Sequence, residues 1–176
     1  MGKRVLVVVD MQKDFVDGSL GSKEAVSIVP AVVKKARDFD GTVLFTRDTH
    51  GEDYMETQEG KYLPVAHCIR GTEGWERIPE LEEMKDSRKA QCFDKPAFGS
   101  VALAEALRAM YEAGELGSVE LVGLCTDICV VSNALLIKAF MPELPVSVDA
   151  SCCAGVTPEK HAAALETMRS CQIQIL

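Results

Sequence analysis

Two short and almost uninterrupted apolar runs constrain the fold of this 176-residue chain more than any other feature of its sequence. The first, Arg4–Val9, consists mainly of valine and leucine and stops at Asp10. The second, Val119–Gly123, leads into a polar turn at Thr126-Asp127. Runs of this length and composition are typical of strands that are covered on both faces, as in the parallel sheets of α/β proteins.

Further strand and helix patterns alternate along the chain. The other expected strands are Gly41–Arg47, Lys89–Phe93 with its end near Lys95, Val146–Val148 and Gln172–Leu176. The expected helices are Ala25–Asp38, Ser100–Ala113, Asp127–Phe140 and a helix that starts at Thr157-Pro158 and runs through Met168. This alternation predicts a single domain over residues 1–176, with a three-layer α/β/α fold around a mainly parallel, roughly six-stranded sheet. The long charged segment from Thr49 to about Lys89 is expected to be functional or to carry short helices.

Composition narrows the classes of partner. The formal net charge of −8 argues against nucleic acid and anionic membranes as partners. Seven cysteines, an odd number, are typical of reduced thiols in a cytoplasmic protein rather than of a disulfide framework. No apolar stretch reaches transmembrane length, and the run that ends at Asp10 is too short for a signal peptide. We therefore expect a cytoplasmic protein that acts on a small molecule.

Cys129 falls in the first turn of the helix that follows Val119–Gly123. There, unpaired backbone N–H groups and the positive end of the helix dipole favour a thiolate. The dipole is worth at most about 2 kcal/mol, so it would lower a thiol pKa from about 8.5 to about 7. A working nucleophile needs a base or a cation in addition. The alternative for Cys129 is a buried structural cysteine.

Asp10 and Lys95 are the residues expected to supply that base and cation. Asp10, Asp48, Lys95 and the turn that carries Cys129 each follow an expected strand, and ligands of parallel sheets bind beyond the carboxyl ends of the strands. Asp10 would take the thiol proton and return it to a leaving amine, while Lys95 would lower the pKa of Cys129. Taken singly, Asp10 also fits a strand-end cap and Lys95 a solvated residue before Pro96.

Four motifs together resemble the isochorismatase-like cysteine hydrolases. Three of them, VVVDMQKDF (Val7 to Phe15), KPAF (Lys95 to Phe98) and GLCTDICV (Gly123 to Val130), are shared with the superfamily as a whole. The fourth, TRDTH (Thr46 to His50) followed by LPVAHC (Leu63 to Cys68), is most similar to nicotinamidases. The motifs occur in the family's order and span nearly the whole chain.

The resemblance implies an amidohydrolase that converts nicotinamide to nicotinate and ammonia. Asp10, Lys95 and Cys129 match the family's catalytic triad, with Cys129 forming a thioester on the substrate carbonyl. The Leu124-Cys125 bond matches a cis peptide of the family, and the backbone N–H groups of Cys125 and Cys129 would form the oxyanion hole.

The resemblance also implies a divalent metal. Asp48, His50 and His67 match the metal ligands of nicotinamidases, and an Asp with two His suits zinc or another first-row ion with open coordination positions. His161 lies in a predicted helix and is interpreted as structural. Phe15 and Leu124 match the substrate pocket.

Several residues depart from the nicotinamidase pattern around the expected pocket. Thr49 and Leu63 stand where tryptophans are usual, Ala66 adds a residue before His67, and Gly99-Ser100 follows Phe98. The aromatic walls for a nicotinamide ring are thus partly missing. The aromatic residues of the long segment that would replace them are Tyr54, Tyr62 and Trp75.

Two alternatives stay open. The first is a metal-independent cysteine hydrolase of the same superfamily that cleaves another small amide, a carbamoyl amine or a ureido compound. The second is a non-catalytic binding domain, which the presence of Asp10, Lys95 and Cys129 disfavours. Three other classes are disfavoured. A true isochorismatase would not need Cys129, which is present. A nucleotide-binding oxidoreductase would need Gly-x-Gly-x-x-Gly after the first strand, and a structural zinc protein would need paired Cys-x-x-Cys knuckles, and the sequence has neither.

Members of the family often form dimers or tetramers, so we expect a homo-oligomer.

Overall fold

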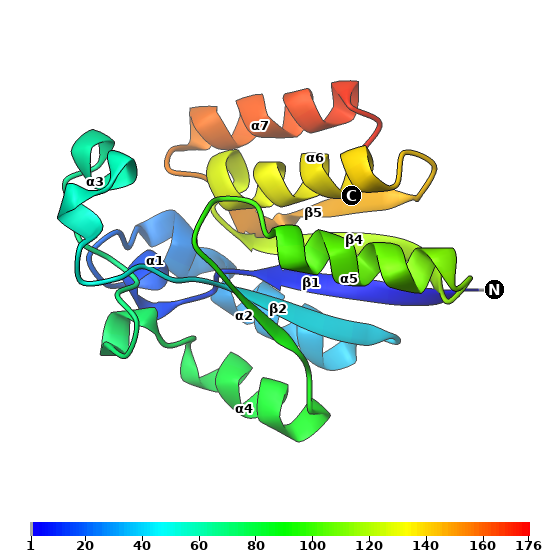
Figure 1. Ribbon diagram of the computed structural model, residues 1–176, viewed down its shortest axis with the longest axis horizontal. Coiled ribbons are helices and arrows are strands. Elements are labelled where there is room, and N and C mark those ends of the chain that lie inside the picture. Colours follow the sequence, from blue (N-terminus) through cyan, green and yellow to red (C-terminus); the bar gives the residue numbers. More distant parts are fainter. Residues whose placement is uncertain (1) are drawn as a thin grey trace.

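The computed structural model describes residues 2–176, and its centre is a six-stranded sheet with the strand order β3-β2-β1-β4-β5-β6 (Figure 1). All five neighbouring pairs of strands are parallel. The strands are β1 (Lys3–Val9), β2 (Thr42–Asp48), β3 (Cys92–Lys95), β4 (Leu116–Leu124), β5 (Val146–Ala154) and β6 (Gln174–Ile175). The strand order reverses between β1 and β4, which is where ligands bind in open parallel sheets.

Helices cover both faces of the sheet, and this confirms the expected three-layer fold. In Figure 1, α5, α6 and α7 lie on one side of the strands, whereas α2 and α4 lie on the other. The helices are α1 (Lys13–Val16), α2 (Lys23–Asp38), α3 (Gln58–Tyr62), α4 (Pro79–Arg88), α5 (Val101–Glu112), α6 (Val131–Phe140) and α7 (Pro158–Ser170). Short 3₁₀ turns occupy Tyr54–Glu56 and Glu73–Trp75, and a π-helical turn occupies Thr126–Val130.

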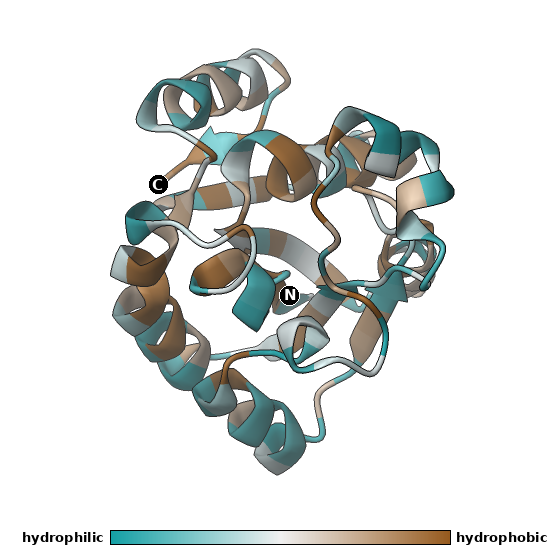
Figure 2. Cartoon of the chain, turned by 90° about the vertical axis from the view of Figure 1, so that its left-hand side faces the viewer, coloured by the Kyte–Doolittle hydropathy of each residue, from teal (hydrophilic) through white to brown (hydrophobic). Residues whose placement is uncertain are grey.

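Strand β1 is buried on both faces, as its uninterrupted apolar sequence predicts. Val5, Val7 and Val9 belong to a core that also contains side chains of α5, α6 and α7. Leu6 and Val8 belong to a second core on the side of α2 and α4. Figure 2 looks onto the edge of the sheet where the strands end, with mainly brown strands between helices that carry both brown and teal residues.

Several expected strands have different boundaries in the structure, and β4 begins three residues earlier than expected, at Leu116. Strand β5 continues to Ala154 instead of ending before Asp149, because Lys35 and Ser151 partner the Asp149 carboxylate inside the strand. Strand β3 starts only at Cys92, since Lys89 adopts a left-handed conformation (φ 51°) at the end of α4. The last strand shortens to Gln174–Ile175.

The segment from Thr49 to Lys89 carries α3, α4 and the two 3₁₀ turns, as its length predicted. None of the helices among the described residues combines the length and the apolar character needed to cross a membrane.

Candidate active site

Asp10 lies directly beyond β1, where its backbone turns away from the strand direction. Its φ of 46° is in the left-handed region, which Asp tolerates better than most residues. The side chain is fully buried, and the hydroxyl of Thr46 donates a hydrogen bond to its Oδ1 atom over 2.7 Å. Sequence reasoning missed Thr46, which belongs to the neighbouring strand β2 and whose side chain reaches Asp10 across the sheet.

Lys95 ends β3 and is almost fully buried, with 1% of its surface exposed. Its Nζ atom lies 2.7 Å from Asp10 Oδ2 and 3.3 Å from Cys129 Sγ. The same ammonium group donates to the carbonyl of Ala97 over 3.1 Å and lies 3.3 Å from Asp48 Oδ1. A solvated role for Lys95 is therefore wrong, because four partners surround its charge.

Cys129 lies in the π-helical turn that joins β4 to α6. The approach to this turn requires Gly123, whose φ is 117° and where a Cβ atom would come within 2.1 Å of the Val9 carbonyl oxygen. The Leu124-Cys125 peptide bond is cis, at the position that the family resemblance implies. The carbonyl of Cys125 accepts hydrogen bonds from the N–H groups of Ile128 and Val130. The turn thus presents Cys129 at the ends of β1 and β4, beside Lys95.

The pKa of Cys129 is raised in the structure, so the lowering expected from the helix start and from Lys95 is outweighed. Burial raises the pKa of the Cys129 thiol well above its ordinary value, and the charge of Asp10 adds to this, while Lys95 opposes it. Burial also raises the pKa of Asp10, against the effect of Lys95. Burial disfavours the ammonium form of Lys95, but Asp10, Cys129 and Asp48 outweigh burial and raise the pKa of Lys95. Cys129 therefore rests as a thiol and needs a base to become a nucleophile.

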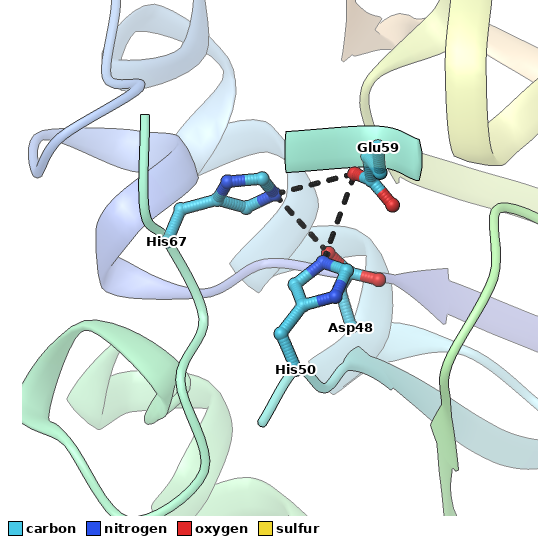
Figure 3. A group of neighbouring side chains, drawn as sticks. All are labelled: Asp48, His50, Glu59 and His67. Atoms are coloured by element: carbon cyan, nitrogen blue, oxygen red, sulfur yellow. Dashed lines mark hydrogen bonds and ion pairs between the residues drawn. The ribbon is translucent and has the colours of Figure 1, made fainter. Parts of the chain in front are cut away.

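Four side chains with donor atoms suited to a metal ion converge beside this triad (Figure 3). Asp48 ends β2, His50 follows it, Glu59 extends from α3, and His67 comes from the loop after α3. One donor atom of each lies within 4.8 Å of the others. The Nε2 atom of His50 is 2.9 Å from Asp48 Oδ2 and 3.7 Å from Glu59 Oε1, and His67 Nε2 is 3.5 Å and 3.7 Å from the same two oxygens. Tetrahedral zinc places its ligand atoms about 3.3 Å apart, so these four residues fit a first-row divalent ion.

Neighbouring groups orient the metal-type donors. The Nδ1 atom of His67 lies 2.8 Å from the carbonyl of Val65, which directs Nε2 towards the cluster. The Gln12 side chain bonds to the backbone N–H and carbonyl of Asp48 over 2.7 and 2.8 Å. Burial raises the pKa of Asp48, but hydrogen bonds from His50 and His67 and the charge of Lys95 outweigh it and lower the pKa. Asp48 is therefore ionised, as a metal ligand must be.

Glu59 is the donor that sequence reasoning missed. Glu59 is not part of the motifs that contain Asp48, His50 and His67. The short helix α3 brings its carboxylate close to them. Nothing in the sequence singles out Glu59 among the four acidic residues between the two histidines, which are Glu52, Asp53, Glu56 and Glu59. With Glu59 included, the cluster holds one donor more than the expected set of an Asp and two His.

A cavity of about 1070 Å³ reaches Cys129 and three of the four metal-type donors. Asp48, Glu59, His67 and Cys129 lie in its wall, as do both expected pocket residues, Phe15 and Leu124. Other lining residues include Leu20, Cys125, Asp127, Tyr62, Leu63, Phe98 and Val156. None of the described residues in the wall is a lysine or an arginine. The cavity wall is mostly apolar, and its carboxylate side chains are those of Asp48, Glu59 and Asp127.

The three aromatic residues of the long segment have different places. Tyr62 lies at the cavity and is 84% exposed. Tyr54 is buried behind the histidines, with ring centroids 4.8 Å from His50 and 4.9 Å from His67. Trp75 is outside the cavity wall, where its Nε1 donates to Thr49 Oγ1 over 2.9 Å. Thr49 is likewise outside the wall, so only Leu63 of the two residues at tryptophan positions faces the cavity.

His161 contacts the turn that carries Cys129 rather than the donor cluster. Its Nδ1 atom lies 2.7 Å from Thr126 Oγ1, which links α7 to the π-helical turn. Burial lowers the pKa of His161. This contact agrees with the structural role expected for His161.

The fold and the site together define an α/β protein with a cysteine-centred site at the carboxyl edge of a parallel sheet, next to a metal-type donor cluster. The family model described as Isochorismatase domain matches residues 4–176, so the chain belongs to the isochorismatase family. This confirms the family resemblance that the four motifs indicate.

Three similar proteins illustrate the relationship. The chain is 29% identical to a nicotinamidase/pyrazinamidase of Mycobacterium tuberculosis, with 98% of each chain covered. It matches the solved structure of a pyrazinamidase of Pyrococcus horikoshii in complex with zinc, with a TM-score of 0.81, 30% identity, and 99% and 98% of the two chains covered. It also matches a pyrazinamidase/nicotinamidase structure from Streptococcus mutans, with a TM-score of 0.84, 27% identity, and 98% and 99% coverage.

Proposed function

We propose that this protein is a nicotinamidase, which hydrolyses nicotinamide to nicotinate and ammonia through a thioester on Cys129. The observation that carries the proposal is the position of Lys95, whose ammonium group contacts Asp10, Cys129 and Asp48 at once. It supports the proposal because Asp10 and Lys95 adjoin Cys129, and the four metal-type donors lie beside them, three of them in the wall of the same cavity as Cys129. The names of the similar proteins support the same activity.

In the proposed first half-reaction, Asp10 removes the thiol proton of Cys129, and Sγ bonds to the carboxamide carbon. The electron pair of the carbonyl moves onto its oxygen, and the backbone N–H groups of Cys125 and Cys129 stabilise the resulting negative charge. The carbonyl then re-forms as the carbon–nitrogen bond breaks. Asp10 gives its proton to the departing nitrogen, so ammonia leaves and a nicotinoyl thioester remains on Cys129.

In the proposed second half-reaction, Asp10 removes a proton from water as the water oxygen attacks the thioester carbon. The carbon–sulfur bond breaks and Cys129 recovers its proton from Asp10, which releases nicotinate. Lys95 keeps its proton throughout, because its carboxylate neighbours and Cys129 raise its pKa. Its role is to hold Asp10 and Cys129 together and to offset the negative charge that passes between them.

We propose that Asp48, His50, Glu59 and His67 hold zinc, whose donor preferences include imidazole nitrogen and carboxylate oxygen. When bound, the metal would supply a Lewis-acid position for the pyridine nitrogen or a water molecule. Phe15 lies against this cluster, with its ring centroid 5.4 Å from that of His67, and Leu124 lines the same cavity. These two side chains would pack against the ring of the substrate.

The charge of the cavity supports a neutral amide as the substrate. Asp48, Glu59 and Asp127 line it, and no lysine or arginine does so among the described residues. A dianion such as isochorismate would find no lysine or arginine in the wall to pair with its carboxylates, because the charge of a bound zinc ion would be offset by Asp48 and Glu59. Nicotinamide carries no net charge, so it needs no such partner.

We further propose that the protein acts in the cytoplasm, in the salvage of nicotinamide for NAD, and as a homo-oligomer. All seven cysteines are free, which a reducing compartment maintains. Tyr62 and Phe98 line the cavity and are 84% and 46% exposed. Exposed aromatic side chains of this kind are consistent with an interface in which a second copy of the chain covers them. Light scattering after gel filtration measures the assembly, and a mass equal to one chain would contradict it.

A substrate panel tests the proposed function. Ammonia release would be measured with nicotinamide, pyrazinamide and a carbamoyl amine, before and after chelation and after addition of zinc. We expect release from the two ring carboxamides, loss of activity on chelation and recovery with zinc. Preference for the carbamoyl amine, with no effect of chelation, would instead identify a metal-independent hydrolase of the same family.

A further inference from the structure

Asn133 is the only asparagine in the chain, and it is buried behind the nucleophile. It lies in the first turn of α6, one helical turn after Cys129, with 1% of its surface exposed. A buried carboxamide is costly unless its donors and acceptor are all paired. The hydrogen bonds of Asn133 therefore indicate what this residue does.

The Asn133 side chain makes three hydrogen bonds to backbone groups of two different segments. Its Nδ2 donates to the carbonyl of Cys129 over 2.8 Å and to the carbonyl of Phe98 over 3.2 Å. Its Oδ1 accepts from the N–H of Ser100 over 2.9 Å. One carboxamide thus joins the backbone of the nucleophile to the connection between β3 and α5.

The same connection also forms a hydrogen bond with the side chain of Lys95. The carbonyl of Ala97, next to Phe98, accepts a hydrogen bond from Lys95 Nζ over 3.1 Å, and the same Nζ lies 3.3 Å from Cys129 Sγ. Phe98 itself lines the cavity over the triad. Asn133 therefore ties together the backbone of Cys129, the segment that contacts the Lys95 ammonium, and one wall of the cavity.

We propose that Asn133 is a positioning residue that sets the distance between Cys129 and Lys95 and holds the Phe98 wall in place. The inference rests on the proposed hydrolase function of this site. Asparagine suits the task because its amide offers two N–H donors and one acceptor in a short side chain. Aspartate keeps the shape but loses the donors, and leucine keeps the size but loses all three hydrogen bonds.

Two variants, Asn133→Leu and Asn133→Asp, test the proposal against a control in the same helix. The control is Ile137→Ala, which removes a buried side chain (1% exposed) one turn further from the site. Melting temperature, kcat, KM for nicotinamide and the rate of Cys129 alkylation by iodoacetamide would be measured for each. Mass spectrometry of the Cys129 peptide separates its alkylation from that of exposed Cys171.

We expect both Asn133 variants to lose about 10–100-fold in kcat, with a much smaller change in KM, because small displacements of reacting groups cost this much. Cys129 alkylation should change by more than about threefold in either direction, because the surroundings of the thiol move. Ile137→Ala should lower the melting temperature but keep kcat and the alkylation rate near those of the parent. If Asn133→Leu is recovered unfolded, Asn133→Asp carries the test.

Asn133 variants that melt early but keep the parent's kcat and alkylation rate would overturn the proposal, because they would show a purely structural role. Failure of the proposed function looks different. In that case the parent protein releases no ammonia from nicotinamide, while the alkylation rates still report whether Asn133 positions Cys129.

Discussion

The Nζ atom of Lys95 lies 3.3 Å from the Oδ1 atom of Asp48. Strands β2 and β3 bring these two residues together, because Asp48 and Lys95 are direct partners in their parallel register. The other oxygen of Asp48, Oδ2, lies 2.9 Å from His50. Asp48 therefore links the metal-type cluster to the proposed triad of Asp10, Lys95 and Cys129, through its contact with Lys95.

Replacing Lys95 by methionine should abolish activity and strongly destabilise the protein. The change leaves the Asp10 and Asp48 carboxylates buried without their cation, and removing one partner of a buried ion pair costs about 3–5 kcal/mol. The matched control is Lys34→Met, whose partner Asp38 is exposed, and such surface pairs contribute about 0–1 kcal/mol. Urea unfolding of the metal-free proteins measures both. Equal stability of the two variants would contradict this account of the site.

Glu59→Gln should weaken zinc binding by at least about tenfold, because an amide oxygen is a poorer ligand than a carboxylate. Exposed Glu56, in the neighbouring 3₁₀ turn, provides the control variant Glu56→Gln. Competition with a chromophoric chelator gives both affinities. If Glu59→Gln holds zinc as tightly as the control, Glu59 is not a ligand.

Thr46→Val should lower kcat about tenfold, because the buried Asp10 Oδ1 loses the hydrogen bond that orients it. Thr46→Ser keeps the hydroxyl and should stay close to the parent. Steady-state kinetics with nicotinamide separates the two variants. Equal losses in both would contradict this role of the hydroxyl, because Thr46→Ser retains it.

The partly buried pair of Lys35 and Asp149 should make stability depend on pH in the acid range. Burial raises the pKa of Asp149, but the Lys35 ammonium and the Ser151 hydroxyl outweigh it, so the pKa lies below the ordinary value of 3.8. The folded state therefore favours the ionised carboxylate. This contribution is present above about pH 4 and is lost as the pH falls through the lowered pKa.

Asp149→Asn should consequently be less stable than the parent at pH 7, and the gap should narrow at pH 3. Urea unfolding at both pH values measures it. A gap that stays constant or widens in acid would show that Asp149 is not stabilised in its ionised form.

The sequence predicts the parts of the site that follow from sheet geometry. Asp10, Asp48 and Lys95 each stand at or just beyond the end of a strand, and parallel strands bring such ends to one edge. Their convergence therefore needs no knowledge of the loops. Cys129 follows in the same way from the strand-to-helix turn after β4.

The remaining parts depend on contacts that have no sequence period. Glu59 reaches the cluster only through the path of α3, Thr46 reaches Asp10 from the neighbouring strand, and Asn133 reaches Ser100 and Phe98 from α6. The raised pKa of Cys129 also cannot be predicted from the sequence, because it depends on how completely the thiol is buried in the folded protein. Likewise, the sequence does not predict the second half of β5. The strand continues past Asp149 because its carboxylate pairs with Lys35, and only the folded protein brings these two residues together.

The rate of ammonia release from nicotinamide, measured for the parent protein and for Cys129→Ala in the presence of zinc, tests the central claim most directly. The account predicts release by the parent and none above background by the variant, with similar melting temperatures because only one sulfur atom is removed. Release by Cys129→Ala at the parent's rate would contradict the claim that Cys129 is the nucleophile. Absence of release by the zinc-loaded parent would contradict nicotinamide as the substrate.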